Sequence, residues 1–254
     1  MATKEEAKVV NADDPMVEKL GRTKRSHVNM LIYGRSGAGK TYRAATAPNP
    51  YIMACDPRGH DSIPFEIPGK VVRSLQDIVD VIEWFESGQH KAHGIETLIV
   101  DGLNFVYDMF LQETGEYMVT AMGAKDPDLM PIGGQMKILR SYKRLLARLV
   151  NLTQLEPAGN RVHVIFTCLD EHLKDAEEAP FEIQPMFGSK TMNRSFPALF
   201  SVIAYIAPVG EDEDGNPTTE RRMLFTEYRG ILARDRLGIF PLMGEAPNLS
   251  EYLK

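Results

Sequence analysis

Several features are scarce in this sequence, and each absence excludes a class of protein. Its 254 residues include only two cysteines, Cys55 and Cys168, each inside an apolar run, so buried free thiols are favoured over a disulfide framework. No run approaches the roughly 20 apolar residues of a membrane-spanning helix, and residues 1–15 are too polar for a signal peptide. We therefore expect a cytoplasmic protein that does not enter a membrane.

An excess of basic residues is also missing. The net charge is −6, which argues against a protein whose whole surface coats nucleic acid but leaves room for a local basic groove. The sequence likewise lacks zinc-ligand spacing, a Ser-His-Asp arrangement and a dinucleotide fingerprint. Hydrophobic residues make up 43% of the chain, which is enough for one sizeable core.

From residue 28 onward, short apolar runs alternate with segments of helical periodicity. The runs are typical of buried strands, and the segments between them carry apolar residues every three or four positions. Strands buried on both faces indicate a mostly parallel sheet that helices cover on each side. The strands are predicted at 28–33, 51–55, 70–73, 97–100, 161–168 and 202–207, and the helices at 74–86, 105–117 and 135–152.

The remaining segments complete the prediction of an α/β fold. Two long loops are expected, at 115–134 and 169–195, and loops of such length are usually functional or disordered. Residues 221–228 follow an acidic turn and are predicted to return as the antiparallel partner of the strand before them, which gives a C-terminal hairpin. We expect an N-terminal arm over residues 1–24 and one domain over residues 25–254.

The most specific motif is a glycine-rich loop between a predicted strand and a helix. Residues 34–41, GRSGAGKT, satisfy the pattern G-x-x-x-x-G-K-[ST] in full. Its glycines let the backbone curl so that successive N–H groups point at phosphate oxygens. Lys40 then contacts the β- and γ-phosphates, and the Thr41 hydroxyl ligates Mg²⁺. The predicted ATP-binding residues are Gly34, Arg35, Ser36, Gly37, Ala38, Gly39, Lys40, Thr41 and Tyr42.

Such a loop needs a second acid for Mg²⁺ at the end of a neighbouring strand. Asp101 closes the apolar run 97–100 and is the candidate. Hydrolysis also needs a group that orients the attacking water. Because no Glu follows Asp101 directly, we assign this role to Asp56, although Asp56 also fits an ordinary turn-starting residue before Pro57.

A polar residue beside the γ-phosphate is expected at the end of another buried strand. Thr167 lies there, near the end of 161–168, and is predicted to sense the γ-phosphate. The residues that follow it, Asp170, Glu171 and His172, are the alternatives.

These motifs together resemble the RecA-like ATPases, and within them a small phage-encoded group linked to recombination and single-strand annealing. The resemblance covers most of residues 28–240 and lies in GRSGAGKT, the acid after the second strand, TLIVDG and VIFTCLDEH. It implies a RecA-like P-loop domain that hydrolyses ATP with Mg²⁺. It also implies a homo-oligomer, as a ring or a filament, with ATP between neighbouring subunits.

A later stretch, ARDRLG at 233–238, is similar to the K-N-R-F-G element of the RadA branch of that superfamily. The resemblance implies that Arg234 and Arg236 reach the γ-phosphate of a neighbouring subunit's nucleotide. Arg stands where that element has Lys, and Asp where it has Asn. The alternative is a pair of surface arginines that bind Asp235 or nearby acids.

Basic residues gather on the predicted helix 135–152. Its apolar residues Ile138, Leu145, Leu149 and Leu152 form the opposing side. A basic stripe alone is more often a solvated face, but the resemblance implies that single-stranded DNA binds near the two long loops, through salt-sensitive backbone contacts. The predicted DNA-binding residues are Lys137, Arg140, Arg144 and Arg148 on the helix, with Lys190 and Arg194 in the second loop.

The sequence therefore predicts a phage-encoded ATPase that binds single-stranded DNA in recombination, repair or replication, in the cytoplasm of the bacterial host. Stimulation of its turnover by DNA is a further expectation. A single-strand-binding or replication protein is a further expected partner. A nucleotide-gated adaptor that acts on a partner protein with little hydrolysis is the alternative. A small-molecule kinase is disfavoured, because no arginine-rich lid is evident.

Overall fold

The structure is a computed structural model that describes residues 27–122, 132–173, 181–210, 218 and 220–253. The predicted arm, residues 1–24, and the acidic turn at 211–217 lie outside these described residues. No helix within them is long and apolar enough to cross a membrane.

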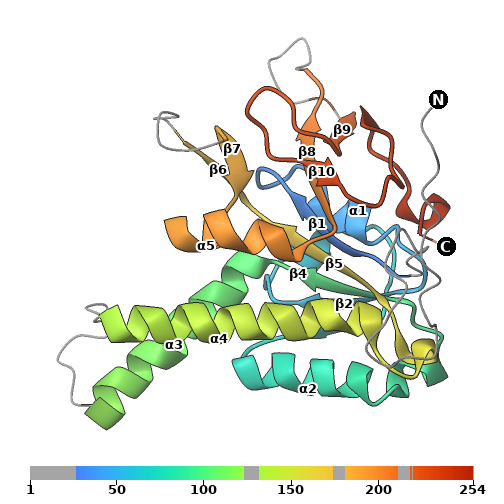
Figure 1. Cartoon of the computed structure of the whole chain (residues 1–254). Helices are drawn as coiled ribbons and strands as arrows, with labels where there is room; N and C mark the ends of the chain where they lie inside the picture. Colours follow the sequence, from blue (N-terminus) through green and yellow to red (C-terminus); the bar gives the residue numbers. More distant parts are fainter. Residues whose placement is uncertain (1–26, 123–131, 174–180, 211–217, 219, 254) are drawn as a thin grey trace, which may run out of the picture.

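A central sheet, most of whose strands are parallel, organises the molecule (Figure 1). From β3 through β2, β4, β5 and β1 to β8, neighbouring strands pair in parallel, whereas β9 and β10 pair antiparallel with β8, and β11 antiparallel with β9. The predicted α/β fold with a C-terminal antiparallel hairpin is confirmed. The strands, in sheet order, are β11 (Met243–Glu245), β9 (Arg221–Leu224), β8 (Val202–Pro208), β1 (Asn29–Tyr33), β5 (His163–Cys168), β4 (Thr97–Asp101), β2 (Pro50–Ala54) and β3 (Gly69–Val71), with β10 (Arg234–Asp235) beside β8.

Alternate residues of each inner strand enter two separate cores. In β1, Leu31 and Tyr33 belong to one core and Met30 and Ile32 to the other, and all four are fully buried. Because successive side chains of a strand point to opposite faces, a strand buried on both faces must be apolar throughout. This explains the continuous apolar runs of the sequence.

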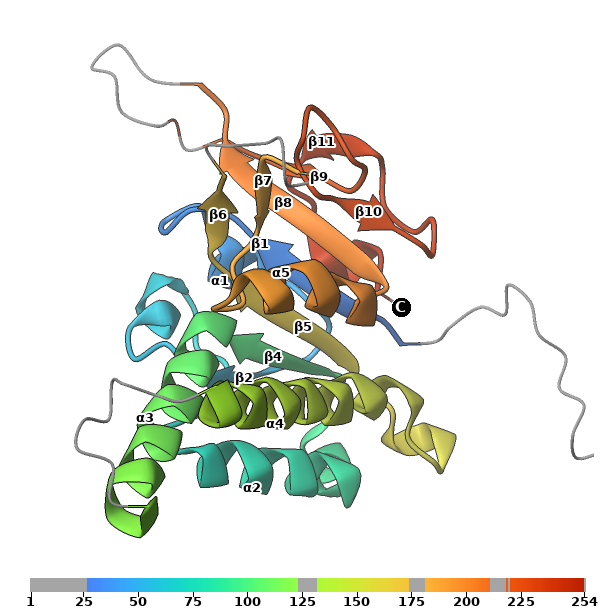
Figure 2. The ribbon, with the colours of Figure 1, turned by 60° about the vertical axis from the view of Figure 1, so that its left-hand side comes forward.

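Helices cover one face of the sheet, and a short helix with the C-terminal residues covers the other (Figure 2). Ile78, Tyr142 and Val106 carry α2, α4 and α3 into the first core, while Ala44 and Leu249 close the second. The helices are α1 (Lys40–Ala44), α2 (Leu75–Glu86), α3 (Leu103–Met122), α4 (Ile132–Asn151) and α5 (Lys190–Ser195), with 3-10 turns η1 (Gly59–Ser62), η2 (Gln89–His93), η3 (Leu152–Gln154), η4 (Ala158–Asn160), η6 (Phe196–Leu199) and η7 (Leu249–Glu251).

The first long loop is shorter than predicted. The prediction of a loop over 115–134 was wrong at both ends, because α3 runs on to Met122 and α4 begins at Ile132. Gly115 is buried inside α3, where packing offsets the cost of about 1 kcal/mol that glycine carries in a helix. Tertiary contact between α3 and α4 therefore overrides the local glycine signal.

The second long loop, 169–195, was also predicted incorrectly, because it contains regular elements. A small hairpin pairs β6 (Asp170–His172) with β7 (Ile183–Pro185), and α5 follows with Ser189 as its cap. The strands have three residues each, too few for a recognisable period of two. Asn104 holds the hairpin at its base: its side-chain oxygen accepts from the Leu169 N–H at 2.8 Å, and its amide donates to the Met186 carbonyl at 2.6 Å.

Candidate functional site: a phosphate-binding pocket

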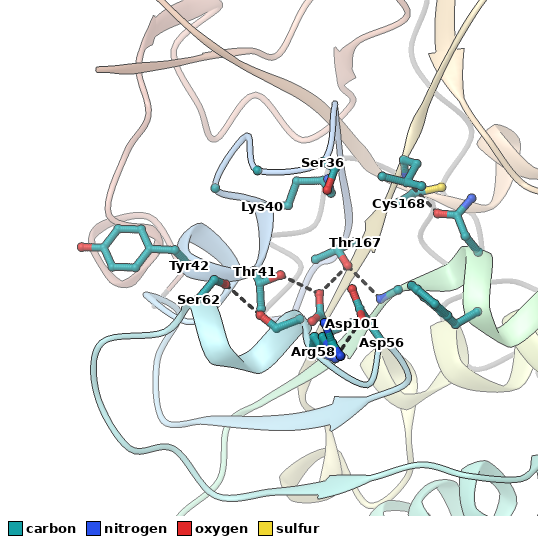
Figure 3. A pocket seen from close by; sticks show the side chains of 17 residues that line it. Ser36, Lys40, Thr41, Tyr42, Asp56, Arg58, Ser62, Asp101, Thr167 and Cys168 are labelled. Carbon is teal, nitrogen blue, oxygen red and sulfur yellow. Dashed lines mark hydrogen bonds between the residues drawn. The ribbon is translucent and has the colours of Figure 1, made fainter. Parts of the chain in front are cut away.

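Parallel strands β1, β4 and β5 end at the same edge of the sheet, and a pocket of about 510 Å³ opens there (Figure 3). The glycine-rich loop joins β1 to α1 along one side, and the turn after β2 forms another side. Pockets at the carboxyl ends of parallel strands are where open α/β sheets bind ligands. The lining includes Ser36, Gly37, Gly39, Lys40, Thr41, Tyr42, Asp56, Arg58, Gly59, Ser62, Asp101, Gly102, Asn104, Phe105, Thr167, Cys168 and Leu169.

Two different constraints require glycine in the loop: the backbone φ angle and the space for a Cβ atom. Gly37 and Gly39 have φ angles of 75° and 89°, which glycine adopts without strain. Gly34 instead makes a close approach, because a Cβ there would lie 2.3 Å from the carbonyl oxygen of Ile206 in β8. The loop is therefore held against the sheet at its start and curled in its middle, as a phosphate-binding backbone requires.

The Lys40 ammonium lies over the loop itself. Its Nζ donates to the carbonyl oxygens of Gly34 at 2.9 Å and Arg35 at 2.8 Å. Burial lowers the pKa of Lys40 from its ordinary value, while the nearby Cys168 and Asp170 raise it. Phosphate oxygens in the loop can replace the two carbonyl oxygens as acceptors, which would bring a full negative charge to the buried ammonium.

Asp101, Thr41 and Thr167 meet at the floor of the pocket. Oδ1 of Asp101 accepts from the Thr41 hydroxyl at 2.9 Å and from the Thr167 hydroxyl at 2.6 Å, and the Thr167 oxygen accepts from the Gly102 N–H at 2.9 Å. Burial raises the pKa of Asp101, and the hydrogen bonds from Thr167 and Thr41 oppose that rise. Thr167 thus contacts the acid directly, which the sequence did not indicate.

The donor atoms at this floor fit a magnesium ion. Oδ2 of Asp101 is buried and has no hydrogen-bond partner among the described residues, although a buried carboxylate oxygen is costly to leave unpaired. A hydroxyl and a carboxylate oxygen lie together, and hard oxygen ligands of this kind are those that Mg²⁺ prefers. Thr41 and Asp101 are the residues that would hold it, as the sequence predicts.

Asp56 lies beside Asp101 at the end of the neighbouring strand. The backbone N–H of Asp56 donates to the Asp101 carbonyl at 3.0 Å, and the Asp56 carboxylate accepts from the Arg58 N–H at 2.9 Å. Asp56 therefore both starts a turn and lines the pocket, so the two interpretations of the sequence are compatible. Figure 3 shows Asp56 and Asp101 together below Lys40.

Several lining residues were missed by sequence reasoning. Arg58, Ser62, Asn104 and Phe105 belong to no motif, and they line the pocket because the turn after β2 and the start of α3 fold over it. Tyr42 was predicted and lies at the rim, exposed, with its ring 6.4 Å from that of Phe65.

Arg234 and Arg236 lie away from the pocket of their own chain. Arg234 pairs with the first half of β8, opposite the end that supports the glycine-rich loop. Its guanidinium donates to the carbonyl oxygens of Pro197 and Phe200, while exposed Arg236 reaches that of Ala198 at 3.5 Å. Neither pairs with Asp235, whose carboxylate accepts four backbone N–H groups instead. Action on a neighbouring subunit stays a prediction.

The predicted basic face of α4 is divided in the structure. Arg140 and Arg144 are exposed and make no ion pair within the described part of the chain, and Lys137 lies over the Tyr117 ring at 4.1 Å. Arg148 instead donates two hydrogen bonds to Glu86 of α2, at 2.8 and 2.6 Å.

Lys190 and Arg194 are exposed on α5. This helix continues into η6, where the centroid of the Phe196 ring lies 5.3 Å from that of Tyr142 in α4. Lys174 of the second loop lies outside the described residues.

Comparison with known proteins adds one finding. A family model described as an AAA domain matches residues 26–237, which include every element that lines the pocket. No curated protein matches the chain.

Proposed function

Because the chain belongs to the AAA domain family of P-loop NTPases, we propose that it is a Mg²⁺-dependent ATPase that binds single-stranded DNA. The observation that carries the nucleotide part of the proposal is the meeting of Lys40, Thr41 and Asp101 in one pocket, which brings together a cation for phosphates and oxygen ligands for a metal ion. Magnesium would neutralise phosphate charge there when bound.

Each pocket residue has a role that its contacts support. The loop backbone and Lys40 bind the β- and γ-phosphates, and Thr41 with Asp101 holds the ion. Asp56 faces the same cavity and orients the attacking water through its carboxylate. Thr167 keeps the Asp101 carboxylate in place with the 2.6 Å hydrogen bond. The exposed ring of Tyr42 at the rim offers an apolar surface to the base.

Two neighbouring elements support the DNA part of the proposal. Exposed cations lie on α4 and on α5, and α4 packs against the turn that follows α5. Tyr117 offers an aromatic ring beside Lys137. Backbone phosphates would pair with the cations, and a base would stack on the ring, without dependence on sequence.

The proposal includes a RecA-like assembly, in which subunits stand side by side in a ring or filament with ATP between them. Arg236 is the better trans-acting candidate of the two arginines, because Arg234 is committed to carbonyl oxygens of its own chain. Such a protein would act in recombination, repair or replication, in the cytoplasm of the bacterial host of a phage.

Hydrolysis of MgATP by the wild type and by Lys40→Met tests the nucleotide part. Loss of the ammonium should lower kcat by about 100-fold or more, because that charge stabilises the transferring phosphoryl group. Equal turnover by the two proteins would contradict the proposal. Circular dichroism of both verifies that the variant folds.

Binding of a fluorescent oligothymidine at low salt, with an ATP analogue present, tests the DNA part, and a duplex of equal length is the control. ATP binding with little hydrolysis, no DNA binding and a stoichiometric complex with another protein would instead identify a nucleotide-gated adaptor.

A further inference from the structure

The pocket holds less positive charge than its substrate requires. Among the described residues that line it, Lys40 and Arg58 are the only cations, while Asp56 and Asp101 contribute two carboxylates. A triphosphate carries about four negative charges, and the two acids add two more. Lys40 and one Mg²⁺ together supply about three positive charges, so about three negative charges stay uncompensated. A second cation at the reacting phosphate is therefore electrostatically favoured.

The backbone of Arg58 is locked onto the floor of the pocket. Its N–H donates to the Asp56 carboxylate at 2.9 Å, and its carbonyl accepts from the Asp61 N–H at 3.2 Å. The next residue, Gly59, touches the metal-binding acid, because a Cβ on it would lie 2.2 Å from Oδ2 of Asp101. The turn that carries Arg58 is thus packed directly against Asp101.

The guanidinium of Arg58 is free to bind a ligand. It is exposed, and within the described chain it makes no hydrogen bond or ion pair. Two other arginines near the loop differ from Arg58. Arg221, whose side chain approaches Gly39, donates to the carbonyl oxygens of Thr218 and Glu220. Arg35, in the loop, is exposed but does not line the pocket.

We propose that Arg58 is a catalytic residue that binds the γ-phosphoryl oxygens of ATP held by its own chain. This inference rests on the proposed ATPase function and adds to it a cation in cis. Water forms the new P–O bond, the bond between the γ-phosphorus and the bridging oxygen breaks with its electrons going to ADP, and the released proton passes to solvent. The planar guanidinium donates two parallel hydrogen bonds to the oxygens on which charge accumulates.

Kinetics of Arg58→Ala, Arg58→Lys and Arg73→Ala test the role. Arg58→Ala should lower kcat by about 100-fold and change KM little, because the contact strengthens only in the transition state. Arg58→Lys should recover part of the rate. Arg73→Ala removes an exposed arginine outside the pocket and should match the wild type. Affinity for ADP with aluminium fluoride should fall in Arg58→Ala while affinity for ADP alone stays constant, which a merely structural role would not produce.

Mixing of inactive subunits decides between cis and trans action. A mixture of the Lys40→Met protein with the Arg58→Ala protein should stay inactive, because no subunit in it has both groups. Recovered hydrolysis would show that Arg58 acts on a neighbour and would overturn the inference, as would wild-type turnover by Arg58→Ala. Arg236→Ala, measured beside them, reports the separate contribution of the predicted trans cation. Absence of Lys40-dependent hydrolysis in the wild type would instead remove the proposed function itself.

Discussion

Asp101 is held in the pocket by contacts from three separate elements. Thr41 of α1 and Thr167 of β5 donate to one of its oxygens, and the turn after β2 packs against the other through Gly59. Because the carboxylate is buried, each contact that fixes its direction matters more than it would in water. Gly59 is therefore the residue whose size most directly limits this site.

Gly59→Ala tests that limit. The added methyl group cannot fit 2.2 Å from Oδ2 of Asp101, so the turn or the acid must shift. We expect turnover to fall by about 10-fold or more, since small misplacement of reacting groups is costly, and stability to fall by about 1–3 kcal/mol.

Gly133→Ala in α4 is the matched control, because a Cβ at that position meets no atom of the described residues within 4 Å. It should leave turnover unchanged and stabilise the helix by as much as about 1 kcal/mol. Thermal unfolding and steady-state hydrolysis measure both variants. A fully active Gly59→Ala protein would show that the turn does not hold the acid.

The helix α4 carries a structural ion pair near its end and exposed arginines nearer its middle. Its final turns bind α2 through Arg148, which contacts Glu86 and lies 3.6 Å from Glu83. Arg140 and Arg144 remain exposed. All three arginines lie at a spacing of four residues, so the sequence pattern cannot separate a structural ion pair from a binding surface.

Arg140→Glu with Arg144→Glu should weaken binding of single-stranded DNA strongly. If each arginine pairs with one phosphate, the slope of log affinity against log salt should shrink by about 1.4. Fluorescence anisotropy over a salt series measures this slope.

The control for that experiment is Arg148→Ala. It should lower stability by about 1 kcal/mol through loss of the partly exposed pair with Glu86 and leave DNA affinity unchanged. An unaltered salt slope in the double variant would place the DNA elsewhere.

For the whole molecule, a buried histidine links stability to pH. His163 in β5 is 4% exposed, and its Nδ1 accepts from the Val28 N–H, which requires that this nitrogen carry no proton. Burial, with a smaller contribution from the His27 ring at 5.0 Å, lowers the pKa of His163 from 6.5 to about 4. The unfolded chain therefore binds the proton first as pH falls.

We expect the contribution of His163 to the free energy of unfolding to be fully present above pH 6.5 and to be lost as the pH falls toward 4. The loss from this residue is at most about 3 kcal/mol. Urea unfolding of the wild type and of His163→Asn measures it, because an Asn side-chain oxygen can keep the bond to Val28 without titrating. If both proteins lose the same stability on acidification, His163 is not the cause.

Much of the fold could be predicted because its signals are local. Ser74 caps α2 by accepting from the Asp77 N–H, and the strands at 97–101 and 163–168 follow their apolar runs. Prediction failed where tertiary contacts replaced local preference, as with Gly115 inside α3 and the β6–β7 hairpin anchored by Asn104. Short elements of that kind depend on the surface to which they attach.

The sequence by itself determined the glycine-rich loop at 34–41 and the position of Asp101 at the end of its strand, because both signals lie in residues that follow one another closely in the chain. Only the tertiary structure decided which arginine faces the pocket. Arg58, Arg148 and Arg234 look alike in a sequence, yet one opens into the cavity, one pairs with Glu86 and one binds carbonyl oxygens. Their contacts differ because strand order and helix packing bring together residues that are far apart in the chain, and a local sequence pattern does not indicate those neighbours.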